Sequence, residues 1–265
     1  MSRFFRRLSL LFALCLLGTG VTRAQFADAS TGLLQMPTAE MQQDGTFMIT
    51  NNFLNKHATS TRWSYHTFQY GFAVSFWGRV EIGYVCTIFN DYWQGWQSRK
   101  GVWMINQDRH FTGRVLLLRE GDGFDWMPAL VFGMSDPVTG SGGGEYIGSN
   151  VDGSVGNGFF NRTYFVLSKH FCTSWGEVGA HVGYQYNHRK DYPINAPCVG
   201  VNWKPVGLQG KGIFDGLNCI AEFDSRTMNL GFVASVWDNR FEAMFELQNF
   251  QWINFGVRYK LRIKK

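Results

Sequence analysis

Charged side chains recur at every second position near the C-terminus, where Arg258, Lys260 and Arg262 alternate with apolar residues. Acidic residues occupy comparable positions in the preceding segments, namely Glu222, Asp224, Glu242 and Glu246. On one face of a sheet, the two sets could form ion pairs, or they could line a channel that selects a charged glycan. We favour ion pairing, because unpaired charges in a narrow enclosed space are costly.

The sequence contains no motif that is typical of an enzyme. Its histidines are His57, His66, His110, His170, His181 and His188. They form no H-E-x-x-H motif and no other close metal-ligand spacing, and no G-x-S-x-G sequence is present for a nucleophilic serine. The glycines between residues 140 and 158 precede no phosphate-binding lysine, so a surface loop explains them better. We therefore expect no enzymatic activity, no cofactor and no metal site.

Residues 1–24 have the composition of a cleavable signal peptide. Three arginines precede an apolar run at residues 8–17, and small residues at positions 22–24 form a cleavage site. A run of about ten residues is too short to cross a bilayer as a helix, so we expect export through the Sec pathway. Removing the four arginines of this segment lowers the basic residues from 25 to 21, against 20 acidic ones. This balance gives no reason to expect a nucleic-acid partner.

Four cysteines follow the signal segment, and their number would permit disulfides in an oxidising compartment. They are Cys86, Cys172, Cys198 and Cys219. The alternation of apolar and polar residues places Cys86 and Cys219 on apolar faces but Cys198 on a polar face. We therefore interpret the cysteines as small hydrophobic residues.

The composition is that of a protein made of strands and turns, with 17% aromatic residues, 31 glycines and only 6 prolines. No shift in composition divides the chain into domains. From residue 253 to residue 263 the odd positions are apolar or aromatic and the even positions are small or polar. This period of two predicts a strand with one apolar and one polar face, long enough for a tilted membrane strand.

The same alternation recurs along the chain. It is clear in residues 80–88, 178–186, 217–224, 228–236 and 241–248, and less regular in residues 45–54, 68–76, 109–118, 128–135, 163–171 and 197–203. Short connections alternate with longer ones through the first eight segments, as in bacterial outer-membrane barrels, but residues 204–216 break that pattern. We expect an all-β fold, an antiparallel up-and-down transmembrane β-barrel of about twelve strands over residues 45–265, in contact with the lipid of a bacterial outer membrane.

A secreted soluble β-sandwich is the alternative fold, because it would also show alternating strands and a signal peptide. Aromatic residues on many apolar faces favour the barrel. So do the even number of strands and the polar faces rich in glycine, asparagine, arginine and glutamate, since such residues suit a barrel lumen.

Residues 25–44, between the signal segment and the first strand, form what we call the strap. Gly32 and Pro37 interrupt any regular element, while Leu33, Leu34 and Met36 are too apolar for a segment exposed to solvent. We expect the strap to pack against the base of the barrel or to plug part of its lumen. The alternative is that it gates a pore.

The strap also carries a family resemblance. Residues 31–40 (TGLLQMPTAE) and 44–47 (DGTF) resemble the opening of YjbH-type proteins, and residues 106–109, 133–137, 139–140 and 221–224 agree with the same family. The motif residues that we single out are Gly32, Leu33, Pro37, Ala39, Asp44 and Gly45. The resemblance implies an outer-membrane barrel associated with exopolysaccharide, here a short, single-barrel member.

Two functions follow as hypotheses. In the first, which depends on the resemblance alone, the barrel supports export or assembly of a surface exopolysaccharide or capsule, with the polysaccharide and its export machinery as partners. In the second, a closed structural or adhesive barrel acts through its long outer loops. A wide continuous lumen would favour the first function, and a lumen filled by the strap and by ion pairs would favour the second.

Overall fold

The computed structural model describes residues 25–26, 28–59, 65–89, 106–137, 159–187, 193–210 and 213–263. The predicted signal peptide and the glycine-rich segment between residues 138 and 158 lie outside these ranges. Among the described residues, no helix has both the length and the apolar character needed to cross a membrane.

Twelve antiparallel strands and one 3-10 turn make up the described structure. They are β1 (Thr46–Leu54), β2 (Thr67–Phe76), β3 (Val80–Phe89), β4 (Asn106–Leu118), β5 (Ala129–Ser135), β6 (Arg162–Thr173), β7 (Gly176–Tyr186), β8 (Asn195–Pro205), η1 (Val206–Leu208), β9 (Phe214–Phe223), β10 (Met228–Val236), β11 (Phe241–Gln248) and β12 (Trp252–Arg262). Every alternating segment of the sequence corresponds to one of these strands.

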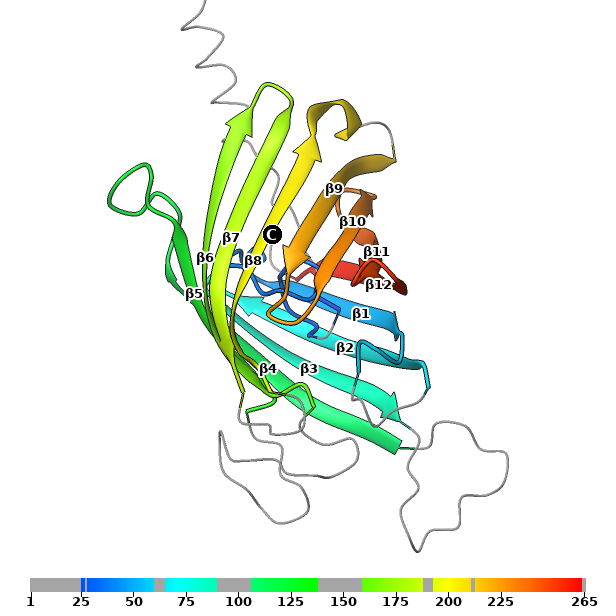
Figure 1. Cartoon of the computed structure of the whole chain (residues 1–265). Coiled ribbons are helices and arrows are strands. Elements are labelled where there is room, and N and C mark those ends of the chain that lie inside the picture. Colours follow the sequence, from blue (N-terminus) through cyan, green and yellow to red (C-terminus); the bar gives the residue numbers. More distant parts are fainter. Residues whose placement is uncertain are drawn as a thin grey trace, which may run out of the picture.

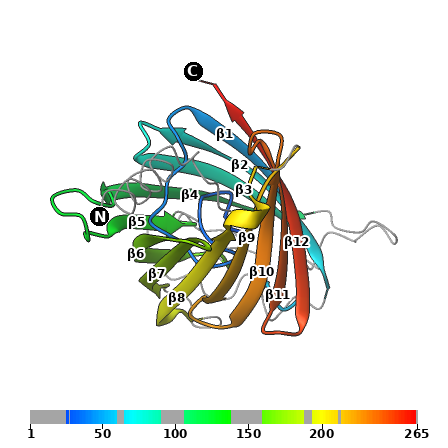
Figure 2. The ribbon, with the colours of Figure 1, turned by 90° about the horizontal axis from the view of Figure 1, so that it is seen from above.

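The sheet closes into a barrel because the first strand pairs with the last. Each strand is hydrogen-bonded to the strands that precede and follow it in sequence, and β1 also pairs with β12, from Thr46 opposite Arg262 to Phe53 opposite Phe255. Figures 1 and 2 show the strands as a continuous ring. The prediction of a closed, up-and-down barrel of about twelve strands is confirmed.

Side chains alternate between the lumen and the outer surface along each strand. On β12, Arg258 is fully buried, whereas its neighbour Val257 is 41% exposed on the outside. The outer surface is covered with large exposed apolar residues, whereas the inward positions hold most of the buried polar and charged side chains. This distribution is the reverse of a soluble protein with an apolar core, and it removes the β-sandwich from consideration.

Tryptophans gather at one end of the barrel. Trp77, Trp126, Trp175 and Trp237 lie in the connections β2–β3, β4–β5, β6–β7 and β10–β11, and each is more than half exposed. Because an up-and-down barrel places these connections at the end where the chain enters β1 and leaves β12, we call this end the terminal end.

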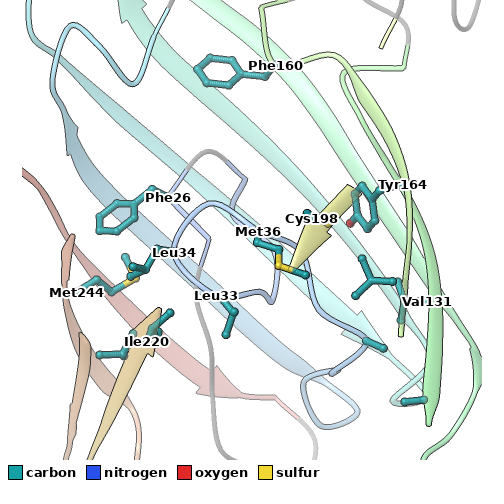
Figure 3. Close-up of a cluster of buried hydrophobic side chains, with 14 of the residues drawn as sticks. Phe26, Leu33, Leu34, Met36, Val131, Phe160, Tyr164, Cys198, Ile220 and Met244 are labelled. Carbon is teal, nitrogen blue, oxygen red and sulfur yellow. The ribbon is translucent and has the colours of Figure 1, made fainter. Parts of the chain in front are cut away.

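The apolar core lies inside the barrel, where residues of the wall pack around the strap. Phe26, Leu33, Leu34 and Met36 of the strap are fully buried. They pack against residues from the barrel wall, which include Val131, Tyr164, Cys198, Ile220 and Met244 (Figure 3). Burying four such side chains contributes roughly 1.5–3 kcal/mol each, so the strap is a structural part of the barrel.

The pairing of β1 with β12 can be tested by a disulfide. Asn51 and Val257 are opposite each other in the register and both face outward. Paired Cα atoms on antiparallel strands are about 4.5–5.5 Å apart, which is within the range of disulfides. We expect Asn51→Cys combined with Val257→Cys to form a disulfide on mild oxidation, detected by mass spectrometry of the linked peptides.

The control for this experiment combines Asn51→Cys with Leu261→Cys. Leu261 faces outward on the same strand but is opposite Phe47, about 13 Å along the strand from the first pair. A disulfide in the control, or none in the paired variant, would contradict the register that closes the barrel.

Candidate functional site: the strap in the barrel lumen

The strap folds into a tight turn at the centre of the lumen. Gly32 and Pro37 form an isolated antiparallel bridge, and the N–H of Leu33 donates to the carbonyl of Met36 at 2.8 Å. Gly32 has no room for a side chain, since a Cβ there would lie 2.2 Å from Cγ of Gln25. Figure 2, a view along the barrel, shows the strap in dark blue inside the ring of strands.

A carboxylate on β9 binds the apex of this turn. The Glu222 carboxylate accepts hydrogen bonds from the backbone N–H groups of Leu34, Gln35 and Met36, with shortest distances of 3.0, 2.6 and 3.2 Å. Consecutive N–H groups that converge on one negative charge form an anion nest, here filled by a side chain of the barrel. Hydrogen bonds to a charged group contribute about 1.5–3 kcal/mol each, which makes Glu222 a principal anchor of the strap.

A second carboxylate, on β3, binds the strap at two points. Glu81 accepts from the backbone N–H and the hydroxyl of Thr31, at 3.0 and 2.7 Å, and from the backbone N–H of Gln42 at 2.7 Å. Arg114 of β4 complements it, since its guanidinium donates to the strap carbonyls of Thr31, Thr38 and Glu40. The pair therefore satisfies both donors and acceptors of an irregular backbone that is buried away from water.

Arginines on other strands bind the remaining parts of the strap. Arg162 of β6 forms an ion pair with Asp28 and donates to the carbonyl of Gln35 at 3.0 Å. Arg258 of β12 donates to the carbonyl of Ser30 at 3.2 Å. Buried backbone groups without partners are strongly unfavourable, so these contacts explain why charged residues line an enclosed lumen.

The charged residues expected from the sequence divide into two groups. Arg258 and Lys260 lie 3.9 and 2.7 Å from the carboxylate of Glu242, which gives the expected ion pairing between β11 and β12. Glu222 and Glu246 bind the strap instead. Glu246 accepts from the side-chain amide of Gln35 at 2.8 Å.

Two of the expected lumen charges lie at the two ends of the barrel. Asp224 follows the last residue of β9, and its carboxylate accepts from the backbone N–H groups of Arg226 and Thr227, as in a turn. Asp224 lines a pocket at this end of the barrel together with Gln35 of the strap and Arg162 of β6. Arg262 is exposed at the end of β12, where it lines the opening of the barrel.

The motif residues of the strap lie in and below the lumen. Leu33 and Ala39 are buried among apolar residues. Asp44 accepts from the backbone N–H of Trp77 at 2.6 Å, and Gly45 has a positive φ of 71° where the chain turns into β1. The motif residues therefore extend from the part of the strap inside the lumen to the terminal end of the barrel.

Four residues that bind or belong to the strap were not among the site residues predicted from the sequence: Glu81, Arg114, Arg162 and Asp28. A signal was present for Glu81, which alternates with apolar residues in a regular segment. Arg114 and Arg162 lie in or next to segments with weaker alternation, and nothing in the local sequence indicates that their partner is the strap. The four cysteines after the signal segment form no disulfide with one another.

Where the strap leaves the lumen, it passes a cluster of ionisable groups. His170 of β6 lies between two carboxylates, with its Nε2 2.7 Å from Glu40 of the strap and its Nδ1 2.6 Å from Glu120 of the β4–β5 connection. Partial burial raises the pKa of Glu120, but hydrogen bonds from His170 and Lys169 outweigh this effect and lower the pKa to about 2.

A polar cavity of about 770 Å³ lies at the terminal end of the barrel, next to the last residues of the strap. Its lining includes Gln42, Asp215, Arg240, Lys260 and Arg262. The cavity therefore mixes amides, carboxylates and cations, and it is separated from the opposite end by the strap.

Comparisons with known proteins identify one family and find similar solved structures. The model of the YjbH family, described as "Exopolysaccharide biosynthesis protein YbjH", matches residues 28–263. Among solved structures, the chain is similar to a KdgM porin, with a TM-score of 0.43 and 8% identity over 81% of this chain and 98% of that one. It is also similar to the β domain of the Bordetella autotransporter BrkA, with a TM-score of 0.33 and 13% identity over 83% of this chain and 100% of that one.

Such low TM-scores and identities add nothing to the topology that the strand pairing already establishes. No curated protein matches the chain. The family match extends from the strap to the end of β12 and so covers the site as well as the barrel. The chain belongs to the YjbH exopolysaccharide biosynthesis family.

Proposed function

We propose that this protein is an outer-membrane barrel, closed by its own strap, that supports assembly of a surface exopolysaccharide through its two ends. The observation that carries the proposal is the strap itself, which fills the middle of the lumen and is bound there by Glu81, Arg114, Arg162, Glu222 and Arg258. The role in exopolysaccharide assembly is inferred from the family. No catalytic step is part of the proposal.

The outer surface supports placement in a membrane. Apolar side chains such as Phe72, Phe165, Val201, Phe232 and Phe255 project from successive parts of the barrel and are exposed. A soluble protein would aggregate through a continuous apolar belt of this kind. In a bilayer, the belt contacts lipid and the tryptophans of the terminal end lie at the membrane interface, as in other membrane barrels.

The filled lumen argues against a permanently open conduit. A glycan chain would have to pass through the space that Leu33, Leu34 and Met36 occupy, and all three side chains are fully buried. The accessible parts of the barrel are its ends, including the polar cavity below the strap. Amide, carboxylate and guanidinium groups at this cavity suit the hydroxyls and acidic groups of a polysaccharide.

A gated pore is the second candidate function. Its support is that the barrel wall binds the strap largely through polar and charged side chains. If the strap left, these groups would line a hydrophilic passage, whereas an apolar wall would not conduct. The two functions therefore differ in whether the strap ever leaves.

Conductance in planar bilayers separates these functions. We expect residues 25–265 with the native sequence to show almost no conductance. Glu222→Gln replaces an acceptor of three backbone N–H groups by an amide that is itself partly a donor, so the strap should detach more often and brief openings should appear. Glu177→Gln is the matched control, because Glu177 contacts Lys204 of the neighbouring strand.

Steady, porin-like conductance of the native protein would contradict the closed barrel. Frequent spontaneous openings of the native protein, increased further in Glu222→Gln but not in Glu177→Gln, would favour the gated pore.

Placement in the membrane is tested by a charge on the outer surface of β12. Val257→Arg puts a cation in the middle of the strand, where loss of hydration should lower the free energy of unfolding by about 2–4 kcal/mol near the bilayer midplane. Ile263→Arg puts the same charge just beyond the strand, where the cost should be about 0–1 kcal/mol. Equilibrium unfolding in phospholipid vesicles measures both values, and equal, small effects would contradict the membrane assignment.

A further inference from the structure

His170, Gly179 and Asn202 lie side by side across three strands near the terminal end. The register places His170 of β6 opposite Gly179 of β7, and Gly179 opposite Asn202 of β8. His181 lies two residues beyond Gly179 and shares its inward face. Glu40 of the strap approaches the same row, and one potential ligand atom from each of Glu40, His170 and His181 lies within 4.8 Å of the other two.

Gly179 leaves space at the centre of this row. A Cβ at Gly179 would lie 2.2 Å from Oδ1 of Asn202, 2.9 Å from Nε2 of His181 and 3.0 Å from Cδ2 of His170. Side chains from three strands thus converge over a residue that has no side chain of its own. Any residue other than glycine would fill the space between them.

Hydrogen bonds outside this space orient the converging groups. The Nδ1 atom of His170 lies 2.6 Å from Glu120, and the Nδ1 atom of His181 lies 2.7 Å from the hydroxyl of Ser168. Asn202 donates its amide to Asn218 at 2.8 Å, which turns its Oδ1 toward Nε2 of His181 at 2.9 Å. A histidine that binds a metal through one nitrogen commonly makes a hydrogen bond to a carboxylate or another oxygen through the other nitrogen.

We propose that Glu40, His170 and His181 bind one divalent transition-metal ion of the zinc type, with Oδ1 of Asn202 or a water molecule as the fourth ligand. Two imidazole nitrogens and a carboxylate oxygen are a ligand set that zinc accepts. Imidazole ligands favour transition metals over calcium and magnesium, which prefer oxygen ligands alone.

Binding requires only small movements. Ligands about 2.0–2.2 Å from a tetrahedral ion are about 3.3–3.6 Å apart, whereas Nε2 of His170 and Oε1 of Glu40 are now 2.7 Å apart. Each histidine binds the ion through an unprotonated Nε2 and keeps one ring proton on Nδ1, where Glu120 or the hydroxyl oxygen of Ser168 accepts it. Any second ring proton is released to solvent, and the carboxylate of Glu40 changes from hydrogen-bond partner to ligand. The side chains of His170 and Glu40 are 20% and 15% exposed, so an ion reaches the site from the terminal end.

The ion would fix the strap to the barrel wall. Glu40 belongs to the part of the strap that leaves the lumen, whereas His170 and His181 belong to two adjacent strands. A bond network through one ion joins these elements more firmly than the present hydrogen bonds. This role concerns the strap alone and does not depend on the membrane or on exopolysaccharide.

The experiment is a calorimetric titration with Zn²⁺ alone of the chain from residue 25 onward, after EDTA treatment. It measures the stoichiometry and the affinity of Zn²⁺ binding. We expect one Zn²⁺ per chain, and loss of at least about 100-fold in affinity in His170→Gln and in Glu40→Gln. Glu120→Gln keeps all proposed ligands but removes the group that orients His170, so its affinity should fall by about 10–100-fold. His66→Gln, at the opposite end of the barrel, is the control and should bind as the native protein does.

Two further measurements distinguish binding at this site from binding of Zn²⁺ elsewhere on the protein. Co²⁺ in place of Zn²⁺ should give the visible absorption of a four- or five-coordinate ion in the native protein but not in His181→Gln. Gly179→Ala should weaken binding by filling the space. Each variant must first give the circular-dichroism spectrum of the native protein, which shows that it has folded. Absence of Zn²⁺ binding by the native protein, or unchanged affinity in folded His170→Gln and Glu40→Gln, would overturn the proposal.

Discussion

The structure depends on a mismatch between the size of the barrel and the size of its side chains. A barrel of about eight strands is filled by the residues of its own wall, whereas this barrel has twelve strands and a wider lumen. The strap supplies the missing volume with apolar side chains. An irregular segment in such a place has buried N–H and carbonyl groups that no neighbouring strand can pair, and each of them needs a partner.

The wall meets this requirement with charged side chains, because one carboxylate or guanidinium satisfies several backbone groups at once. Glu222 binds three consecutive N–H groups, and Arg114 binds three carbonyls. Glu222 tolerates burial through its hydrogen bonds, and Arg114 also lies 3.8 Å from the carboxylate of Glu81. In a water-filled barrel, the polar faces of the strands would contact water. Here they contact the strap of the same chain.

Sequence patterns were sufficient for the barrel and insufficient for the site. The strands were predictable because their period of two is local, as in β12, where eleven residues carry the signal. The contacts of the strap were not, since Glu222 and Gln35 are far apart in sequence and only closure of the barrel brings them together. The cluster of His170 and His181 was missed for a similar reason. Their approach depends on the β6–β7 register and on Gly179, which no spacing of histidines reveals.

Release of the strap would have to be cooperative. If the whole strap left the lumen, the carboxylates of Glu81 and Glu222 would lose the strap N–H groups that they bind at the same time, and water would have to replace these hydrogen bonds together. A partial departure leaves buried charges without partners and is therefore less stable than either end state. A released state of the strap, which the gated pore requires, would therefore form in one cooperative step. A ligand shifts such an equilibrium only if it binds one state more tightly, and a hydroxyl-rich chain that could satisfy the same charges is the kind of ligand that would favour release.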